Sequence, residues 1–468
     1  MLREHAEKAI LFAQNQGCSY CDARSEVIEK HGFVIENGHI EHIVTHHESG
    51  IGIRVLCDGA WGFYSTSDIT MIDNGITNAI KAAKHYSQKK KSKVILAEIP
   101  SVIQNIKYKI KKEVTPYSLG KVAFDCDRII RDNKKITKSI VSASSSTVSK
   151  YFVNSEGTKI MQEFSDTIMD LTAIAHQAGL TQSINTTEGG RGGLEKITES
   201  VDMFSIAKET SDKAVKLLDA KPVKEEKATV VMNPDFVALL AHEILGHPSE
   251  ADRVLGKEMA WAGGAWWAGM LGEQIGSKNL NVIDDPTIEG NLGWYNYDDE
   301  GTKSQRKQLV KDGKLVDHMY SRETASIFNR KPNASMRATS YRFMPLIRMA
   351  CTCIEKGDWN PQEMIKDVKN GYLISNMKIP SIDMRRYNWS ISCQYANKIE
   401  NGEVMDLLRD VIVVGTAPEF FNSIDACGKD FTVRPITNCG KGDPMQQMKM
   451  GNGGPSIRGV ATVKSVGA

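Results

Sequence analysis

Alternating hydrophobic and polar residues in the first hundred positions predict two β-hairpins. The alternation runs on both sides of Asn37-Gly38 and again on both sides of Asp58-Gly59. Asn-Gly and Asp-Gly favour tight hairpin turns because these residues tolerate positive φ. Apolar residues at helical spacing predict an amphipathic helix at the N-terminus and a second one near residues 76–85. This mixture of elements is typical of an α+β fold.

Helix and strand patterns continue through the rest of the chain. A helix is expected at about 201–218, and Asp312-Gly313 and Asn401-Gly402 predict further hairpins downstream. The fold class expected from this order is α+β, with antiparallel sheets in the N-terminal domains and a β-rich C-terminal domain around one helix. The expected domains are an N-terminal α+β domain (1–90), a central α+β domain (91–223) and the β-rich C-terminal domain (224–468).

Length and charge exclude several classes of protein. A chain of 468 residues with 41% hydrophobic residues is long enough to bury two or three cores. Its formal charge of +2 gives no overall attraction to nucleic acid or a membrane surface. The lysine-rich segment 89–112 has one aromatic residue and no arginine, so a solvated linker is expected there. We expect a cytoplasmic protein with reduced cysteines and neither a nucleic-acid nor a membrane partner.

The segment "NPDFVALLAHEILGHPSEAD", residues 233–252, carries the candidate chemistry. Asn233 is a good N-cap and Pro234 suits the first helical turn, so a helix should begin here. His242 and His247 lie five residues apart and would point about 140° apart on a regular α-helix. A regular helix therefore cannot present both imidazoles to one ion.

A wider helical turn would remove this obstacle. Gly246 permits a wide or left-handed turn, and Pro248 disfavours the α conformation at His247. In a π-type turn, residues five apart share one face. We therefore expect His242 and His247 to bind a metal ion and Glu243 to activate water as a general base. A catalytic zinc site also needs a third protein ligand, and the pattern leaves open Glu250, Asp252 and the cysteines.

Beyond this spacing, the segment "HEILGHPSEAD" resembles the HExxxH-type signature of the TldD branch of the TldD/PmbA metallopeptidases. The resemblance extends over nearly the whole chain, because other segments resemble landmarks of that family in the same order. These segments are "CDGAWGFYSTSD", "GGRGG", "DDEGT", "SRETA", "IEKGDW", "RDVIVVG" and "NCGKG".

The resemblance implies a zinc-dependent metalloprotease that hydrolyses unfolded or flexible peptides inside the enclosed chamber of a two-fold dimer. The partner would be a second copy or a PmbA/TldE-like sister subunit, which lacks the metal motif. This chain retains His242, Glu243 and His247 and so resembles the catalytic branch. A noncatalytic peptide-binding or regulatory subunit of the same family is the alternative.

The family's third ligand is a cysteine in a Cys-Gly-Lys segment near the C-terminus. Cys427 and Cys439 both stand in such a segment, and Cys439 falls at the family's position. The resemblance therefore implies Zn²⁺ held by His242, His247 and Cys439. Cys427 is expected to be a small buried residue.

The tryptophan-rich segment "AWAGGAWWAGM" follows the metal motif and contains Trp261, Trp266 and Trp267. Its glycines would allow it to act as a flexible apolar lid over a peptide channel. The same composition suits a hydrophobic plug between domains. The sequence leaves these two interpretations open.

Overall fold

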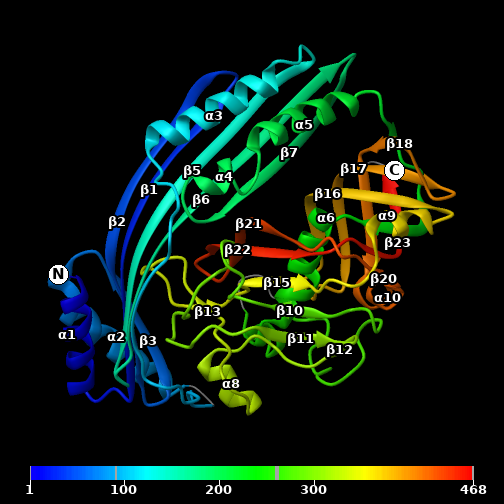
Figure 1. Ribbon diagram of the computed structural model, residues 1–468. Coiled ribbons are helices and arrows are strands. Elements are labelled where there is room, and N and C mark those ends of the chain that lie inside the picture. Colours follow the sequence, from blue (N-terminus) through cyan, green and yellow to red (C-terminus); the bar gives the residue numbers. More distant parts are fainter. Residues whose placement is uncertain (1, 90–91, 259–262, 466–468) are drawn as a thin grey trace.

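The structure is a computed structural model that describes residues 2–89, 92–258 and 263–465. Its fold class is α+β, which confirms the expectation from the sequence. In Figure 1, long strands from the N-terminal half curve along one side of the molecule, and the C-terminal half lies on their inner side.

The N-terminal half is built around one long sheet, in which the described strands follow the order β3-β2-β1-β5-β6-β4 with β7 beside β6. Both predicted hairpins are present, and Asn37 and Gly38 have φ of 49° and 84°, as a tight hairpin turn requires. Strand β1 also pairs with β5 from Asp22 to Glu36. The strands are β1 (Tyr20–Glu36), β2 (His39–Cys57), β3 (Ala60–Thr66), β4 (Ile103–Lys107), β5 (Ile136–Asn154), β6 (Lys159–Gln177) and β7 (Leu180–Arg191).

The lysine-rich segment is not only a linker. Its residues Ile103–Lys107 form β4, which pairs in parallel with β6 at the edge of the long sheet. Local composition missed this strand because its pairing depends on a partner more than fifty residues away. The sheet contains strands from both sides of residue 90, and the division of the chain into three domains stays a prediction.

Amphipathic helices cover the two ends of the long sheet. Ile76 and Ile80 of α2 pack with Ile53 of β2 in one core cluster. At the other end, α3 and α5 form a second cluster with β5, β6 and β7. The helices are α1 (Leu2–Asn15), η1 (Ile69–Met71), α2 (Ile72–Ser87), α3 (Pro116–Arg131), α4 (Glu195–Thr198) and α5 (Met203–Lys216).

Two sheets form the C-terminal half. In the first, the pairings β9-β16-β17-β19-β23-β9 close into a ring, to which β8, β18 and β20 are attached. In the second, the described strands follow the order β12-β11-β10-β15-β22-β21. The strands of both sheets are β8 (Lys221–Pro222), β9 (Glu226–Met232), β16 (Asn370–Ile382), β17 (Asn388–Glu400), β18 (Glu403–Arg409), β19 (Val411–Thr416), β20 (Ala426–Cys427), β23 (Ile457–Ser465), β10 (Val282–Asp284), β11 (Lys307–Lys311), β12 (Lys314–Leu315), β15 (Cys351–Ile354), β21 (Thr432–Lys441) and β22 (Gln446–Gly454).

Helix α6 lies between these sheets and contacts both β16 and β22. Its residues Phe236 and Leu240, with Ile244 after it, belong to the largest core cluster of the described residues. The sequence of the metal motif is thereby anchored in the interior. The remaining elements are β13 (Met336–Arg337), β14 (Leu346–Ile347), α6 (Pro234–Leu240), η2 (Ala241–Gly246), η3 (His247–Ser249), α7 (Ala251–Val254), α8 (Arg322–Phe328), α9 (Pro361–Lys366) and α10 (Ala417–Ser423).

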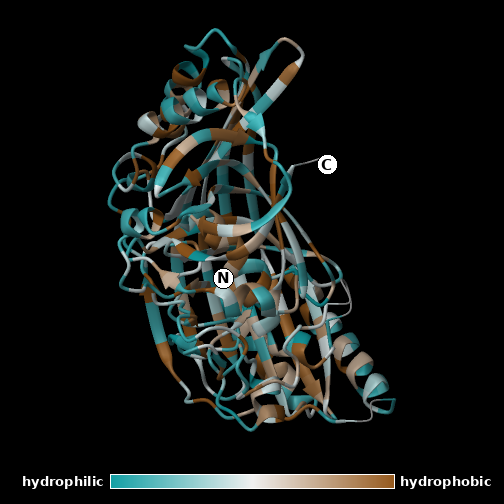
Figure 2. Cartoon of the chain, turned by 90° about the vertical axis from the view of Figure 1, so that its right-hand side faces the viewer, coloured by the Kyte–Doolittle hydropathy of each residue, from teal (hydrophilic) through white to brown (hydrophobic). Residues whose placement is uncertain are grey.

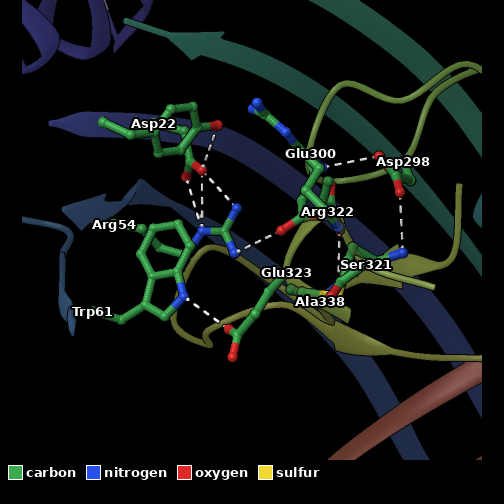
Figure 3. Close-up of polar contacts among 12 residues, drawn as sticks. Asp22, Arg54, Trp61, Asp298, Glu300, Ser321, Arg322, Glu323 and Ala338 are labelled. Atoms are coloured by element: carbon green, nitrogen blue, oxygen red, sulfur yellow. Dashed lines mark hydrogen bonds and ion pairs between the residues drawn. The ribbon is translucent and has the colours of Figure 1, made fainter. Parts of the chain in front are cut away.

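A buried polar network joins the long sheet to the C-terminal half (Figure 3). Arg54 of β2 is paired with Asp22 of β1 at 2.6 Å and with Glu300 at 3.3 Å. Arg322 of α8 is in turn paired with Glu156, at 2.7 Å. Buried ion pairs add little net stability but tolerate few alternative arrangements. The network therefore fixes how the C-terminal half sits against the sheet.

No helix in the described part of the chain is long and apolar enough to cross a membrane. Figure 2 shows hydrophilic and hydrophobic residues mixed along the helices. The helices that cover the long sheet therefore have a polar face as well as the face that they bury, whereas Phe236–Leu240 of α6 are all buried.

Candidate metal centre

The metal-motif helix begins where the sequence predicts. The Asn233 side chain accepts the backbone N–H of Phe236 at 3.0 Å, and Pro234 occupies the first turn. A proline at this position costs no hydrogen bond, because its nitrogen would have no partner in the helix. The start of α6 is thus determined by local sequence.

A π-helix, η2, follows α6 and brings the two histidines together. His242 and His247 face one another with ring centroids 4.8 Å apart. The expected widening of the helix is confirmed, because a π-turn places residues five apart on the same face.

One part of the expected cause is confirmed and one is wrong. Gly246 lies in the wide turn, as the sequence allowed, with a φ of −70°. His247 keeps α-type angles of −59° and −41° in spite of Pro248, so the steric preference of a residue before proline does not decide its conformation here. Gly246 also serves packing, since a Cβ there would lie 2.0 Å from Met349 Sδ.

Cys439 reaches the two histidines from β21. Its Sγ atom lies 3.4 Å from His247 Nε2, and one donor atom from each of His242, His247 and Cys439 lies within 4.8 Å of the others. Nitrogen and sulfur ligands of one tetrahedral zinc ion lie about 3.5 Å apart, given bond lengths of about 2.0 and 2.3 Å. The three side chains therefore fit a zinc ion by spacing and by donor type.

Each histidine is oriented through its Nδ1 atom. Asn452 Oδ1 lies 3.0 Å from His242 Nδ1, and Glu250 Oε2 lies 3.1 Å from His247 Nδ1. Contacts of this kind hold the ring and leave Nε2 to face a metal ion. Glu250 therefore stands behind His247, on the side away from Cys439, and acts as a positioning residue.

Lys441 completes the support behind His247. Its buried ammonium lies 3.2 Å from Glu250 Oε2 and 2.7 Å from Asp252 Oδ2. Although burial opposes ionisation, Lys441, His247 and Arg253 hold the pKa of Glu250 well below its ordinary value. The lysine of the Cys-Gly-Lys segment thus acts on the site through Glu250. Asp252 is a second carboxylate partner of the same lysine.

The electrostatics of the site favour a thiolate. Burial would raise the pKa of Cys439, but His242, His247 and Arg348 hold that pKa well below its usual range. Burial likewise opposes a charge on His242, yet the Cys439 thiolate outweighs it and raises the pKa of His242 to about 9. A divalent cation would replace the positive charge that the histidines now supply.

The two histidines and Cys439 line a pocket with a volume of about 620 Å³, and Glu243 lines it as well. Its carboxylate is paired with Arg386, which lies in the turn between β16 and β17. Although burial opposes ionisation, Arg386 and the two histidines lower the pKa of Glu243. No local pattern pointed to Arg386, which is 143 residues away in sequence.

The tryptophans that the structure describes support the π-helix. Trp266 donates its indole N–H to the Ile244 carbonyl at 3.0 Å, and the fully buried Trp267 donates to the Pro248 carbonyl at 2.6 Å. These contacts satisfy carbonyls at the end of the irregular helix, where regular bonding is interrupted. Both side chains therefore brace the end of the π-helix. Trp261 lies outside the described residues, and the lid and the plug both stay predictions.

Cys427, the other cysteine in a Cys-Gly-Lys segment, lies in β20. It is buried, and its thiol donates to the Asn279 carbonyl at 3.5 Å. Among the described residues, the His/Cys/Asp/Glu group close enough to share one ion consists of His242, His247 and Cys439.

The site thus combines two histidines on a widened helix, a cysteine from an adjacent strand and a pocket-lining glutamate, which are residue types that zinc hydrolases use. Family models of the PmbA/TldA metallopeptidase match three parts of the chain: domain 1 at residues 21–87, the central domain at 111–218 and the C-terminal domain at 225–462. The chain belongs to the TldD/PmbA metallopeptidase family.

Individual relatives agree with this assignment. A metalloprotease of Methanocaldococcus jannaschii is 31% identical, over 95% of this chain and 96% of its own length. A zinc metalloprotease TldD homolog of Saccharolobus solfataricus is 26% identical, over 96% of this chain and 97% of its own. The crystal structure of TldE from Thermococcus kodakarensis has the same fold, with a TM-score of 0.80, 18% identity and coverage of 98% of this chain and 100% of that chain.

Proposed function

We propose that this chain is a zinc-dependent endopeptidase that hydrolyses unfolded or flexible peptides. The observation that carries the proposal is the convergence of His242, His247 and Cys439 beside Glu243. Two imidazoles and a thiolate suit Zn²⁺ and leave one position of a tetrahedral shell open. Bound Zn²⁺ would supply Lewis acidity toward a peptide carbonyl.

Glu243 is the proposed general base. It would take a proton from the attacking water and pass it to the leaving amine. Its lowered pKa keeps the carboxylate ionised at neutral pH. Arg386 contacts one oxygen of this carboxylate, Oε2, which leaves Oε1 to accept the proton.

The proposed mode of substrate binding is addition of a strand. Among the described strands, β21 pairs only with β22, and β21 carries Cys439. An extended peptide that paired with the other edge of β21 would be held by backbone hydrogen bonds, which are indifferent to side chains. A folded substrate cannot supply such a strand until it opens, so broad cleavage of flexible chains is expected.

We infer from the family that the protein works in the cytoplasm as a two-fold dimer that encloses the site. The fold shared with TldE supports a heterodimer with a TldE-like sister subunit, and a homodimer is the other arrangement. A noncatalytic peptide-binding subunit is the alternative function.

Metal analysis combined with cleavage of a flexible peptide tests the proposal. The full-length chain, purified without chelator, should contain zinc in a ratio of about one per chain. It should cut a fluorogenic unstructured peptide, lose this activity with a chelator and regain it with zinc. Absence of zinc binding contradicts the metal centre. Zinc binding without cleavage, in the presence and absence of a TldE-like partner, favours the noncatalytic alternative.

A further inference from the structure

A second cavity adjoins the metal pocket on the inner side of the long sheet. Its volume is about 490 Å³, within the usual range for ligand sites. Thr437 of β21, two residues before Cys439, lines both this cavity and the metal pocket. A peptide that passes the metal centre along β21 would therefore reach the second cavity.

The cavity holds more positive charge than its carboxylates balance. Lys449 lies 3.1 Å from Ser146 Oγ and 3.7 Å from Asp166, whose carboxylate is already paired with Arg191 at 3.0 Å. Burial lowers the pKa of Lys449; Asp166 opposes this shift, and Lys30 and Arg191 add to it. One carboxylate thus faces a group of cations.

Arg337 adds a further cation that makes no ion pair, although the charge of Asp299 acts on it from beyond ion-pair distance. Its guanidinium donates to the carbonyls of Met349 and Lys449 at 2.7 and 2.9 Å and lies over the Tyr295 ring. No carboxylate of the described residues lies within 4.0 Å of it, nor of Lys30 on the cavity wall. A buried cation without an anionic partner is costly, so an anionic ligand would be stabilised here.

The other acidic residues of the cavity are occupied. Glu26 and Asp299 are paired with Lys150 at 3.2 and 2.8 Å, and Glu48 is paired with Arg342 at 2.6 Å. The cavity also contains Asp298. Burial and the nearby Glu300 raise the pKa of Asp298 to about 7, although backbone N–H groups bound to its carboxylate oppose the shift.

We propose that this cavity binds a carboxylate of the peptide substrate, held by Lys449 and Arg337. The proposal deepens the proposed function, on which it rests: it adds an acidic preference to otherwise sequence-indifferent binding. Ammonium and guanidinium groups are matched to carboxylates, and Phe164, Tyr295 and Met448 offer apolar surface to the neighbouring part of the chain. The carboxylate belongs either to an acidic side chain or to the C-terminus of the peptide.

The carboxylate site is tested by measuring how tightly peptides bind to a variant that does not cleave them. The full-length chain carrying Glu243→Gln, with zinc added, would be titrated against four fluorescent unstructured peptides. They contain one internal glutamate or glutamine, each with a free or amidated C-terminus. We expect about tenfold tighter binding when the recognised carboxylate is present, the usual effect of a charge-assisted hydrogen bond. The glutamate and the free C-terminus are varied separately, which identifies the source of that carboxylate.

Lys449→Met, combined with Glu243→Gln, should remove most of this preference. The matched control is Lys208→Met, because Lys208 lies on α5 with its side chain 74% exposed. If the Glu243→Gln chain, with its cavity residues unaltered, bound all four peptides equally or bound none of them, the proposal would be overturned. Equal weakening of acidic and neutral peptides by Lys449→Met would also overturn it.

Failure of the proposed function gives a different result. If the unaltered chain cuts no peptide but Glu243→Gln binds acidic peptides more tightly, the endopeptidase proposal fails and the carboxylate site stands. If the unaltered chain cuts peptides and the Glu243→Gln chain binds acidic and neutral peptides equally well, the carboxylate site fails and the endopeptidase proposal stands.

Discussion

Replacement of Cys439 by serine tests the metal ligands sharply, because the chain has a second cysteine in the same Cys-Gly-Lys context. Cys439→Ser exchanges a thiolate for a hydroxyl that stays protonated at neutral pH. Sγ lies 3.4 Å from His247 Nε2, and its pKa is held well below the usual range although burial opposes this. The thiolate can therefore bind a metal ion without first losing a proton.

The expected loss follows from the place of Cys439 in the site. Loss of a partner that only orients a metal ligand weakens binding about 10- to 100-fold. Loss of a ligand should cost at least as much, so zinc affinity should fall about 100-fold or more, which corresponds to about 2.7 kcal/mol. Competition with a chromophoric chelator measures the affinity, and thermal unfolding checks that the variant is folded.

Cys427→Ser is the matched control for this measurement. The Cys427 thiol contacts the Asn279 carbonyl, and a serine hydroxyl can keep that contact. Its zinc affinity should equal that of the unaltered chain. Unchanged affinity in Cys439→Ser, or a loss that appears in Cys427→Ser instead, would refute the reasoning.

Three other substitutions test the neighbouring residues. Glu243→Gln should retain zinc and lose at least about 100-fold in peptide hydrolysis, because it removes the base and no ligand; an active variant would exclude this role. Arg386→Gln removes a cation that lowers the pKa of Glu243, so the acid limb of the pH–rate profile should move to higher pH, and an unmoved limb would contradict that link. The folded pKa of Glu250 lies below its ordinary 4.5, so its stabilising contribution is complete above that value and lost as pH falls through the folded pKa. Urea unfolding should therefore show that Glu250→Gln is less stable than the unaltered chain at neutral pH and similar to it in acid. A difference in unfolding free energy that does not change with pH would contradict this role of Glu250.

The features that the sequence predicts correctly are local. Asn37-Gly38 determines a hairpin turn, and Asn233-Pro234 determines a helix start, because the backbone preferences of these residues act over a few positions. The widening after residue 240 is also predictable, since it is needed if histidines five apart are to meet. The family resemblance singles out Cys439, which the structure brings to these histidines.

The contacts that the sequence does not reveal join distant segments. Asn452 meets His242 across 210 positions, and Lys441 meets Glu250 across 191. Polar residues of this kind occur throughout the chain, and only the fold selects the ones that reach the site. The contact that requires a glycine at position 246 is hidden for the same reason, since Met349 lies more than a hundred residues away in sequence.

Cleavage of one protein in its native and its permanently unfolded form tests the central claim most directly. The zinc-loaded chain, alone and with a TldE-like partner, would be incubated with both forms, and Glu243→Gln would serve as the inactive control. We predict that the unfolded form is cut, that the native form is spared until it unfolds, and that a chelator stops the reaction. Equal cleavage of both forms, or no cleavage of either with zinc bound, would contradict the account.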